Sequence, residues 1–342
     1  MPDIIKIDGS TLEGGGQILR TATALSAITK RPCRVFNIRK NRPKPGLMPQ
    51  HLLAIQTLAQ LCCGTIKGDG PGSEEIEFSP GQAYKQNVSV KIPTAGSIVL
   101  VMQALIPAAL FAPYPVKISF SGGATDTFFS PTADYFRRVF LKTLEKMGVK
   151  TEISFEKRGY YPEGGSQAEI TVHPCKLKST DLTERGALLK ISALSGASET
   201  LREKQVAERQ LQGVREILGK LKLPTEEKAE YYPTQCPGSQ ICLIAEFENT
   251  VIGTDNLGKL GKRAEDVGKE AALELLKEQK GRTCLDKHLA DQIIPYLALS
   301  QRKSRITTSE ITMHCRTNIW VVEKFLKGKF DIKDDTVSWN PS

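Results

Sequence analysis

The order in which strand-like and helix-like segments recur constrains the fold more than any other feature of this sequence. A first round reads strand 4–7, helix 16–29, strand 33–38, helix 47–61, and strands near 65 and 76–79. A second reads strand 87–92, helix 96–111, strand 115–120, helix 132–147, and strands 149–154 and 167–172. Both rounds follow the order β-α-β-α-β-β, which indicates an internally repeated α/β (α+β) architecture.

A richly charged segment from about 180 to 282 breaks this rhythm. It predicts a helix near 200–219, a strand over 240–247 and a helix near 262–277, each with its own apolar face. Helix 287–299, strand 304–308 and helix 316–326 then resume the earlier order, as the end of a third round. We therefore predict a discontinuous repeat domain over 1–181 and 282–342, with a small α/β domain inserted at 182–281.

Composition narrows the class of partner. The 342 residues carry a net charge of +9, which favours polyanions such as nucleic acid, although a merely basic protein fits the charge equally well. The longest apolar run, 98–112, is interrupted by Gln103 and Pro107 and predicts a buried helix, so no membrane association is expected. The eight cysteines form no C-x-x-C pair, which disfavours a zinc ribbon and favours a reducing compartment.

A glycine-rich turn with basic neighbours is the first candidate site. Three glycines, 14–16, precede a helix whose N-terminus can receive an oxyanion, and Glu13 places a carboxylate beside the turn for a divalent cation. Cationic side chains follow at Arg20, Arg39, Lys40, Arg42 and Lys44, with Gln50 and His51 close behind. A glycine turn beside a solvated basic loop is the plainer alternative, but the combination favours a phosphate site.

Among four histidines, His314 has the most reactive setting. It lies between a predicted strand and the last helix, with Arg316, Thr317 and Asn318 within a turn. A neutral imidazole can attack a phosphoanhydride, although a structural histidine is the commoner occupant of such a junction. Two weaker candidates are Gln103, a polar residue in an apolar helix, and the loop 122–129, whose Phe128 and Phe129 could form a wall for a base or ribose or belong to an ordinary loop.

Six motifs in order resemble the RNA 3′-terminal phosphate cyclase family across essentially the full length. They are 13–20 (EGGGQILR), 42–47 (RPKPGL) with Gln50 and His51, the Gly122-Gly123 loop, 161–165 (YPEGG), 289–292 (LADQ), and His314 with Thr317-Asn318. The resemblance implies three β-α-β-α-β-β repeats with a small inserted domain. It also implies a ligase-type enzyme that uses ATP to convert an RNA 3′-phosphate into a 2′,3′-cyclic phosphate, with release of AMP and pyrophosphate.

The resemblance also assigns roles by position. His314 corresponds to the nucleophile that becomes adenylylated, and Glu13 to a ligand of Mg²⁺ or Mn²⁺. The residues that correspond to those binding the phosphates of ATP or RNA are Arg20, Arg39, Arg42, Gln50 and His51. The residues that correspond to further ATP contacts are Gln103, His288, Leu289, Ala290, Asp291 and Gln292. His288 stands where the family often has an aromatic residue, which leaves its own role open.

Two other classes of protein compete with this interpretation. A cyclase-like ribosome-biogenesis factor shares the fold but lacks the nucleophilic histidine, and the presence of His314 argues against it. An enolpyruvyl-transferase-like enzyme is built from similar repeats, but its expected signatures are absent. We expect a cytoplasmic protein that acts on RNA with a 3′-phosphate end, and the sequence leaves the oligomeric state open, a homodimer included.

Overall fold

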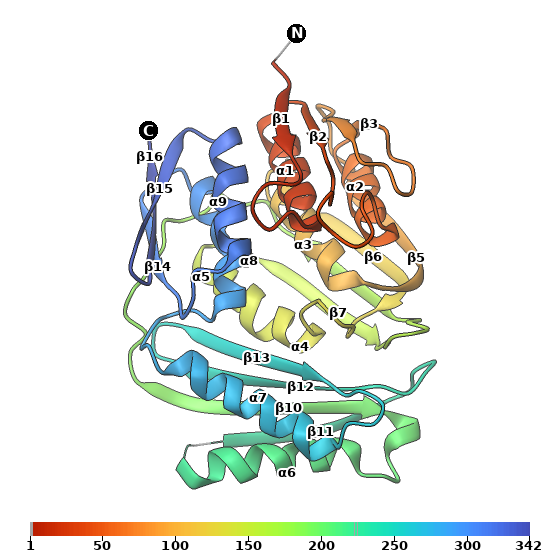
Figure 1. The fold of residues 1–342 in the computed structure, drawn as a ribbon, viewed down its shortest axis with the longest axis vertical. Helices are drawn as coiled ribbons and strands as arrows, with labels where there is room; N and C mark the ends of the chain where they lie inside the picture. The colour runs from red at the N-terminus through yellow and green to blue at the C-terminus, as the bar shows by residue number, and fades with distance from the viewer. Residues whose placement is uncertain (1–2, 222, 224) are drawn as a thin grey trace.

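Three stretches of the chain form the same structural unit. The computed structural model describes residues 3–221, 223 and 225–342. Within them, strands and helices follow one another three times in the order β-α-β-α-β-β, and a further unit interrupts the third repeat (Figure 1). The predicted fold class is therefore confirmed.

The first repeat follows the predicted order closely. Its strands alternate buried and exposed positions, so that Ile5 and Ile7 face the core, and its two helices each bury one side. The elements are β1 (Ile5–Asp8), α1 (Gly16–Thr29), β2 (Cys33–Phe36), α2 (Pro49–Leu61), β3 (Thr65–Lys67) and β4 (Ile76–Ser79).

The second repeat contains α3, which forms within the longest apolar run and is buried as the sequence predicts. The predicted helix 132–147 forms with a π-helical turn inside it, where the N–H of Leu141 donates to the carbonyl of Phe136. The elements are β5 (Asn87–Ser97), α3 (Ile98–Ala109), β6 (Val116–Ala124), α4 (Ala133–Tyr135), the π-turn (Phe136–Phe140), α5 (Leu141–Lys146), β7 (Thr151–Lys157) and β8 (Gln167–Val172).

The third repeat is split by the insertion. Its first strand, β9, precedes the insertion and pairs in parallel with β14, which follows it. The elements are β9 (Asp181–Leu182), α8 (Lys287–Leu299), β14 (Ser304–Thr307), α9 (Met313–Phe325), β15 (Gly328–Lys333) and β16 (Thr336–Pro341). Strands β15 and β16 complete the third repeat, and the sequence pattern does not predict these two strands.

The three repeat sheets share one topology. Their strand orders are β1-β2-β4-β3, β5-β6-β8-β7 and β9-β14-β16-β15, and in each sheet the first two strands are parallel while the other pairs are antiparallel. Helices pack against one another across the repeats, with α1 against α3 and α9, and within the third repeat α8 packs against α9. The ends of helices from different repeats therefore meet near the centre of the molecule (Figure 1).

The inserted segment forms a fourth sheet with its own core. The strand order is β11-β10-β12-β13, and α6 packs against α7 on one face. A separate cluster of buried apolar residues, Leu211, Leu243 and Val267 among them, joins these helices to the sheet. The elements are β10 (Leu188–Ser198), α6 (Val206–Leu218), β11 (Thr225–Tyr232), β12 (Ser239–Phe247), β13 (Val251–Leu257) and α7 (Ala264–Gln279).

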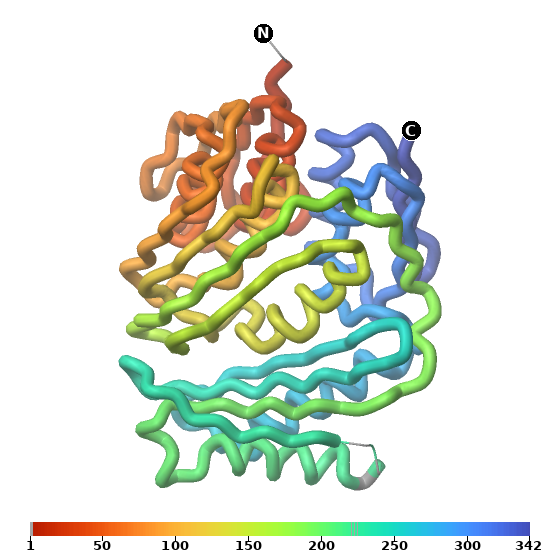
Figure 2. Tube along the Cα trace, turned by 180° about the vertical axis from the view of Figure 1, so that it is seen from behind, coloured from red at the N-terminus to blue at the C-terminus, as the bar shows by residue number. Residues whose placement is uncertain are grey.

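The insertion lies beside the second repeat. Figure 2 shows the chain descending into the lower unit in green and returning from it in blue. Leu182 still pairs with Ile306 in the third repeat's sheet, while the exact domain limits at 181/182 and 281/282 stay a prediction. Among the described residues, no helix combines the length and the apolar character that a membrane crossing requires.

Candidate active site

One large cavity of about 1630 Å³ lies where the helices of the three repeats converge. The repeats contribute the turn before α1, the basic loop before α2, the face of α3 that carries Gln103, one face of α8, and the N-terminal part of α9. The cavity brings together all but two of the residues predicted from the sequence: Glu13, Arg20, Arg39, Arg42, Gln50, His51, Gln103, His288, Asp291, Gln292 and His314.

The glycine turn allows side chains to approach the start of α1 closely. A Cβ atom at Gly15 would collide with the Glu13 carboxylate, and one at Gly16 would collide with the His51 imidazole. Gly14 has a φ of +64°, a conformation that a larger residue rarely adopts. In the described part of the chain no side chain caps α1 at Gly15, so its first N–H groups can receive an anion.

Glu13 lies at the centre of this arrangement. Its backbone N–H donates to Oγ1 of Thr317 at 3.3 Å, and Arg42 both pairs with its carboxylate and donates to its carbonyl oxygen at 3.1 Å. The side chain is only 12% exposed, and its Oε2 atom is buried without a hydrogen-bond partner among the described residues. Such an orphaned carboxylate oxygen is costly unless a cation or a donor completes it.

His314 lies in the first turn of α9, half exposed to the cavity. Thr312 caps this helix by accepting from the N–H of Cys315 at 3.0 Å, which fixes the position of the turn. The Nδ1 atom of His314 is 3.6 Å from Oε2 of Glu13, which is too long for a hydrogen bond. Burial, followed by the charges of Arg20 and Arg42, lowers the pKa of His314, so the imidazole is neutral at pH 7.

His51 is also held neutral. Its Nδ1 atom accepts from the N–H of Met48 at 3.4 Å, which leaves Nε2 to carry the proton and to act as a donor toward the cavity. Burial, with the charges of Arg20 and Arg39, lowers the pKa of His51 to about 3. The same burial lowers the pKa of Arg20 to about 10, so Arg20 stays cationic at neutral pH. The site therefore offers fixed cations and a neutral N–H donor to an anion.

Buried and partly buried polar contacts join α8 to α3 and to the start of α9, and join α9 to α1. Gln103 Nε2 donates to Gln292 Oε1 at 2.7 Å, and Thr312 Oγ1 donates to Asp291 Oδ1 at 2.5 Å. Asn318 donates to the Asp291 carbonyl at 2.7 Å and accepts from Thr21 at 2.8 Å. Burial raises the pKa of Asp291 to about 7. These contacts set the distance between the repeats that form the cavity.

Leu289 and Ala290 do not line the cavity. Both side chains are fully buried in the main core, and the N–H of Leu289 is used by the carboxylate of Asp286, which caps α8. The helical period explains the difference, because Asp291 and Gln292 face the cavity while the two preceding residues face inward. A direct contact of Leu289 or Ala290 with ATP stays an untested prediction.

The structure also adds residues that sequence reasoning missed. Asp255, Asn256 and Leu257 reach the cavity from the end of β13, so the inserted unit forms part of its wall. Asp255 accepts from the N–H of Thr132 at 2.6 Å, and burial raises the pKa of Asp255 to about 6. No sequence signal marks these residues, because only the packing of the insertion against the second repeat brings them to the cavity.

Fold and site together define a class: a protein of three β-α-β-α-β-β repeats whose central cavity gathers arginines, a buried carboxylate and a neutral histidine. A sequence model of the family described as "RNA 3′-terminal phosphate cyclase" matches residues 11–332. The chain belongs to the RNA 3′-terminal phosphate cyclase family.

Curated relatives can be aligned with this chain over nearly their whole length. The chain is 47% identical to the RNA 3′-terminal phosphate cyclase of Pyrococcus abyssi, with 96% of this chain and 95% of that protein covered. It is 44% identical to the protein of that name from Pyrobaculum aerophilum, with 95% and 94% covered. A solved structure of the enolpyruvyl transferase NikO from Streptomyces tendae matches with a TM-score of 0.31 and 10% identity, covering 100% of this chain and 66% of that one, and supports no conclusion.

Proposed function

We propose that this protein is an ATP-dependent RNA 3′-terminal phosphate cyclase, which converts an RNA 3′-phosphate end into a 2′,3′-cyclic phosphate. Family membership and the names of the relatives support the overall reaction. The observation that carries the mechanism is the placement of a neutral His314 beside Glu13, Arg20 and Arg42 in one cavity.

The proposed reaction proceeds in three displacements. An imidazole nitrogen of His314 attacks the α-phosphorus of ATP, and pyrophosphate leaves as the N–P bond forms. The RNA 3′-phosphate then attacks the same phosphorus and releases His314, giving an RNA(3′)pp(5′)A end. Finally, the neighbouring ribose 2′-OH attacks the terminal RNA phosphorus, loses its proton, and expels AMP. Adenylylation is needed because a phosphate monoester dianion is a poor electrophile without a good leaving group.

The residues around His314 suit the first displacement. The carboxylate beside Nδ1 favours the tautomer with the proton on Nδ1, which leaves the lone pair of Nε2 available for attack. Arg20, Arg39 and Arg42 would hold the triphosphate, with Gln50 and the N–H donor of His51 beside them. Gln103, His288, Asp291 and Gln292 would contact the adenosine part of ATP.

A divalent cation, Mg²⁺ or Mn²⁺, fits this donor set. The orphaned Oε2 of Glu13 is a suitable carboxylate ligand, and no group of three or more His, Cys, Asp or Glu residues forms an all-protein cage in the described part of the chain. Mg²⁺ is commonly held by one or two carboxylates together with substrate phosphates. When bound, the cation would offset the negative charge of the triphosphate. A cytoplasmic location and a homodimer stay predictions.

The test is incubation of the pure protein with α-³²P-labelled ATP and Mg²⁺, followed by denaturing electrophoresis. We expect acid-labile, alkali-stable label on the wild type and none on His314→Ala. His173→Ala is the matched control, because His173 pairs with Glu152 on the surface, outside the cavity, and should keep its label. Label on His314→Ala would place the nucleophile elsewhere. No label on any protein would favour the non-catalytic, ribosome-biogenesis type of function.

A further inference from the structure

Two adjacent phenylalanines project from the loop between β6 and α4 at the rim of the cavity. Phe128 is 43% exposed and Phe129 is 102% exposed, and both line the cavity. Tyr161, 60% exposed, approaches Phe128 edge to face, with the ring centroids 6.5 Å apart. These rings contribute little to the core, so burial of apolar surface does not account for their presence.

Phe129 also holds its backbone in a costly conformation. Its φ is +62°, in the left-handed region that a bulky residue seldom adopts. This conformation costs on the order of 1–3 kcal/mol and persists only where the surroundings enforce it. A strained backbone that directs a fully exposed ring toward a substrate cavity indicates selection for binding rather than for folding.

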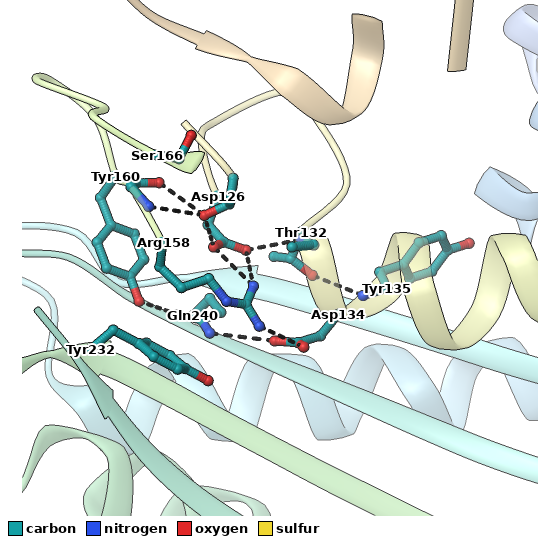
Figure 3. A network of polar contacts seen from close by, with 12 residues as sticks. Asp126, Thr132, Asp134, Tyr135, Arg158, Tyr160, Ser166, Tyr232 and Gln240 are labelled. Atoms are coloured by element: carbon teal, nitrogen blue, oxygen red, sulfur yellow. Dashed lines mark hydrogen bonds and ion pairs between the residues drawn. The ribbon is translucent and has the colours of Figure 1, made fainter. Parts of the chain in front are cut away.

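Both ends of this loop are anchored in a buried polar network. Asp126 accepts from Arg158 at 3.2 Å and from the N–H of Ala133 at 3.0 Å, so one carboxylate fixes the residues on either side of the loop. Figure 3 shows Arg158 between Asp126 and Asp134, with Tyr160 reaching Gln240 of the inserted unit. The rings therefore extend from a rigid base.

A second set of contacts closes the loop itself. Ser130 Oγ donates to the carbonyl of Thr127 at 2.9 Å, and the N–H of Thr132 donates to Asp255 of β13. The loop is thereby held between the second repeat and the insertion. A preorganised aromatic surface loses little entropy when a planar partner stacks on it.

We propose that Phe128 and Phe129 form a stacking platform for the terminal base of the RNA, and so position its 3′-phosphate in the cavity; this rests on the proposed function. Base–aromatic stacking is worth about 1–3 kcal/mol per base and tolerates any base. An RNA end must enter from solvent, and this exposed rim lies on the same cavity as His314. The deeper wall is more enclosed, with Gln103, Ala104 and Tyr296, and suits the smaller adenosine group.

The test compares RNA binding by the wild type and by variants of the two phenylalanines. Fluorescence anisotropy is measured with an RNA ending in a 3′-phosphate and with the same RNA lacking only its terminal base. We expect loss of the base to weaken binding to the wild type about 5- to 100-fold. The Phe128→Ala/Phe129→Ala variant should bind the intact RNA as weakly as the wild type binds the abasic one, with no further loss on the abasic RNA.

Matched variants separate stacking from general effects. Phe128→Tyr/Phe129→Tyr should again bind the intact RNA more tightly than the abasic RNA. Leu260→Ala removes another fully exposed apolar side chain, which lies outside the cavity, and should also keep this difference. The proposal is overturned if the double alanine variant still discriminates between the two RNAs as the wild type does. It is also overturned if that variant loses the AMP adduct while its RNA binding is intact, which would assign the rings to ATP. A wild type that forms no AMP adduct but discriminates between the RNAs would refute only the proposed catalysis.

Discussion

The Nδ1 atom of His314 lies 3.6 Å from Oε2 of Glu13, although the two residues come from opposite ends of the chain. The pairing depends on α1 and α9 packing side by side, which also brings Thr317 to the backbone of Glu13. A carboxylate, a neutral imidazole and two arginines thus occupy one corner of the cavity. The charge of each of these groups affects the ionisation of the others.

The pKa of His314 should lie below that of a free histidine. Burial and the nearby guanidinium groups lower its pKa from 6.5, so the imidazole loses its proton at a lower pH than a free histidine. Arg42→Gln removes one cation and should raise the pKa of His314 toward its ordinary value. NMR titration of the His314 ring in the free protein measures both values, and a wild-type pKa at or above 6.5 would contradict the prediction.

Loss of the Glu13 carboxylate should slow adenylylation. Glu13→Ala removes the proposed metal ligand, and we expect the rate of AMP-adduct formation to fall by about 100-fold, the usual cost of one lost electrostatic contact in a transition state. The rate is measured against Mg²⁺ and Mn²⁺ concentration, with Glu152→Ala on the surface as the control. Full labelling of Glu13→Ala at ordinary metal concentrations would rule out this role.

A single methyl group at Gly16 should disturb the phosphate site. In a helix interior alanine is favoured over glycine by about 1 kcal/mol, and by less at a first position such as Gly16, but here its Cβ would collide with His51. Gly16→Ala should therefore weaken ATP binding, measured by calorimetry, without a gain in stability. In a His51→Ala background the collision disappears, so Gly16→Ala should there stabilise the fold. A stabilising effect in the wild-type background would argue against the close contact.

Ionisation of Asp291 should oppose folding. Its pKa is about 7 in the folded protein against 3.8 for a free side chain, so the native state binds more protons in that interval. The stability associated with this group is complete below pH 3.8 and is lost as the pH rises through 7. Denaturant unfolding of Asp291→Asn should show a stability advantage over the wild type that grows between pH 3.8 and pH 7 and then levels off, at no more than about 4 kcal/mol. A stability advantage of Asp291→Asn that does not depend on pH would refute the prediction.

Removal of Arg158 should destabilise the protein. Arg158→Met leaves Asp126 and Asp134 without their cation in a buried environment, which typically costs about 3–5 kcal/mol. Denaturant unfolding measures the loss. Arg34→Met is the control, because Arg34 pairs with Glu75 on the surface and such pairs contribute at most about 1 kcal/mol. Similar losses for the two variants would refute the prediction.

The sequence alone determined the repeat order and most of the site. Helical and strand periods depend on local spacing, so α1, α3 and α8 could be located from the pattern, and the motifs around Glu13 and His314 identified the family. The local sequence also showed that the turn before α1 consists of glycines. It did not show that the absence of Cβ atoms there makes room for Glu13 and His51.

Tertiary structure decided which side chains share the cavity. Leu289 and Ala290 belong to the same motif as Asp291, but the orientation of α8 turns the first two into the core and the third toward the wall of the cavity. Asp255 joins the wall only because the insertion packs beside the loop of Phe128 and Phe129. Contacts between segments far apart in sequence leave no periodic trace, because they depend on how whole elements pack and not on the spacing of residues within one element.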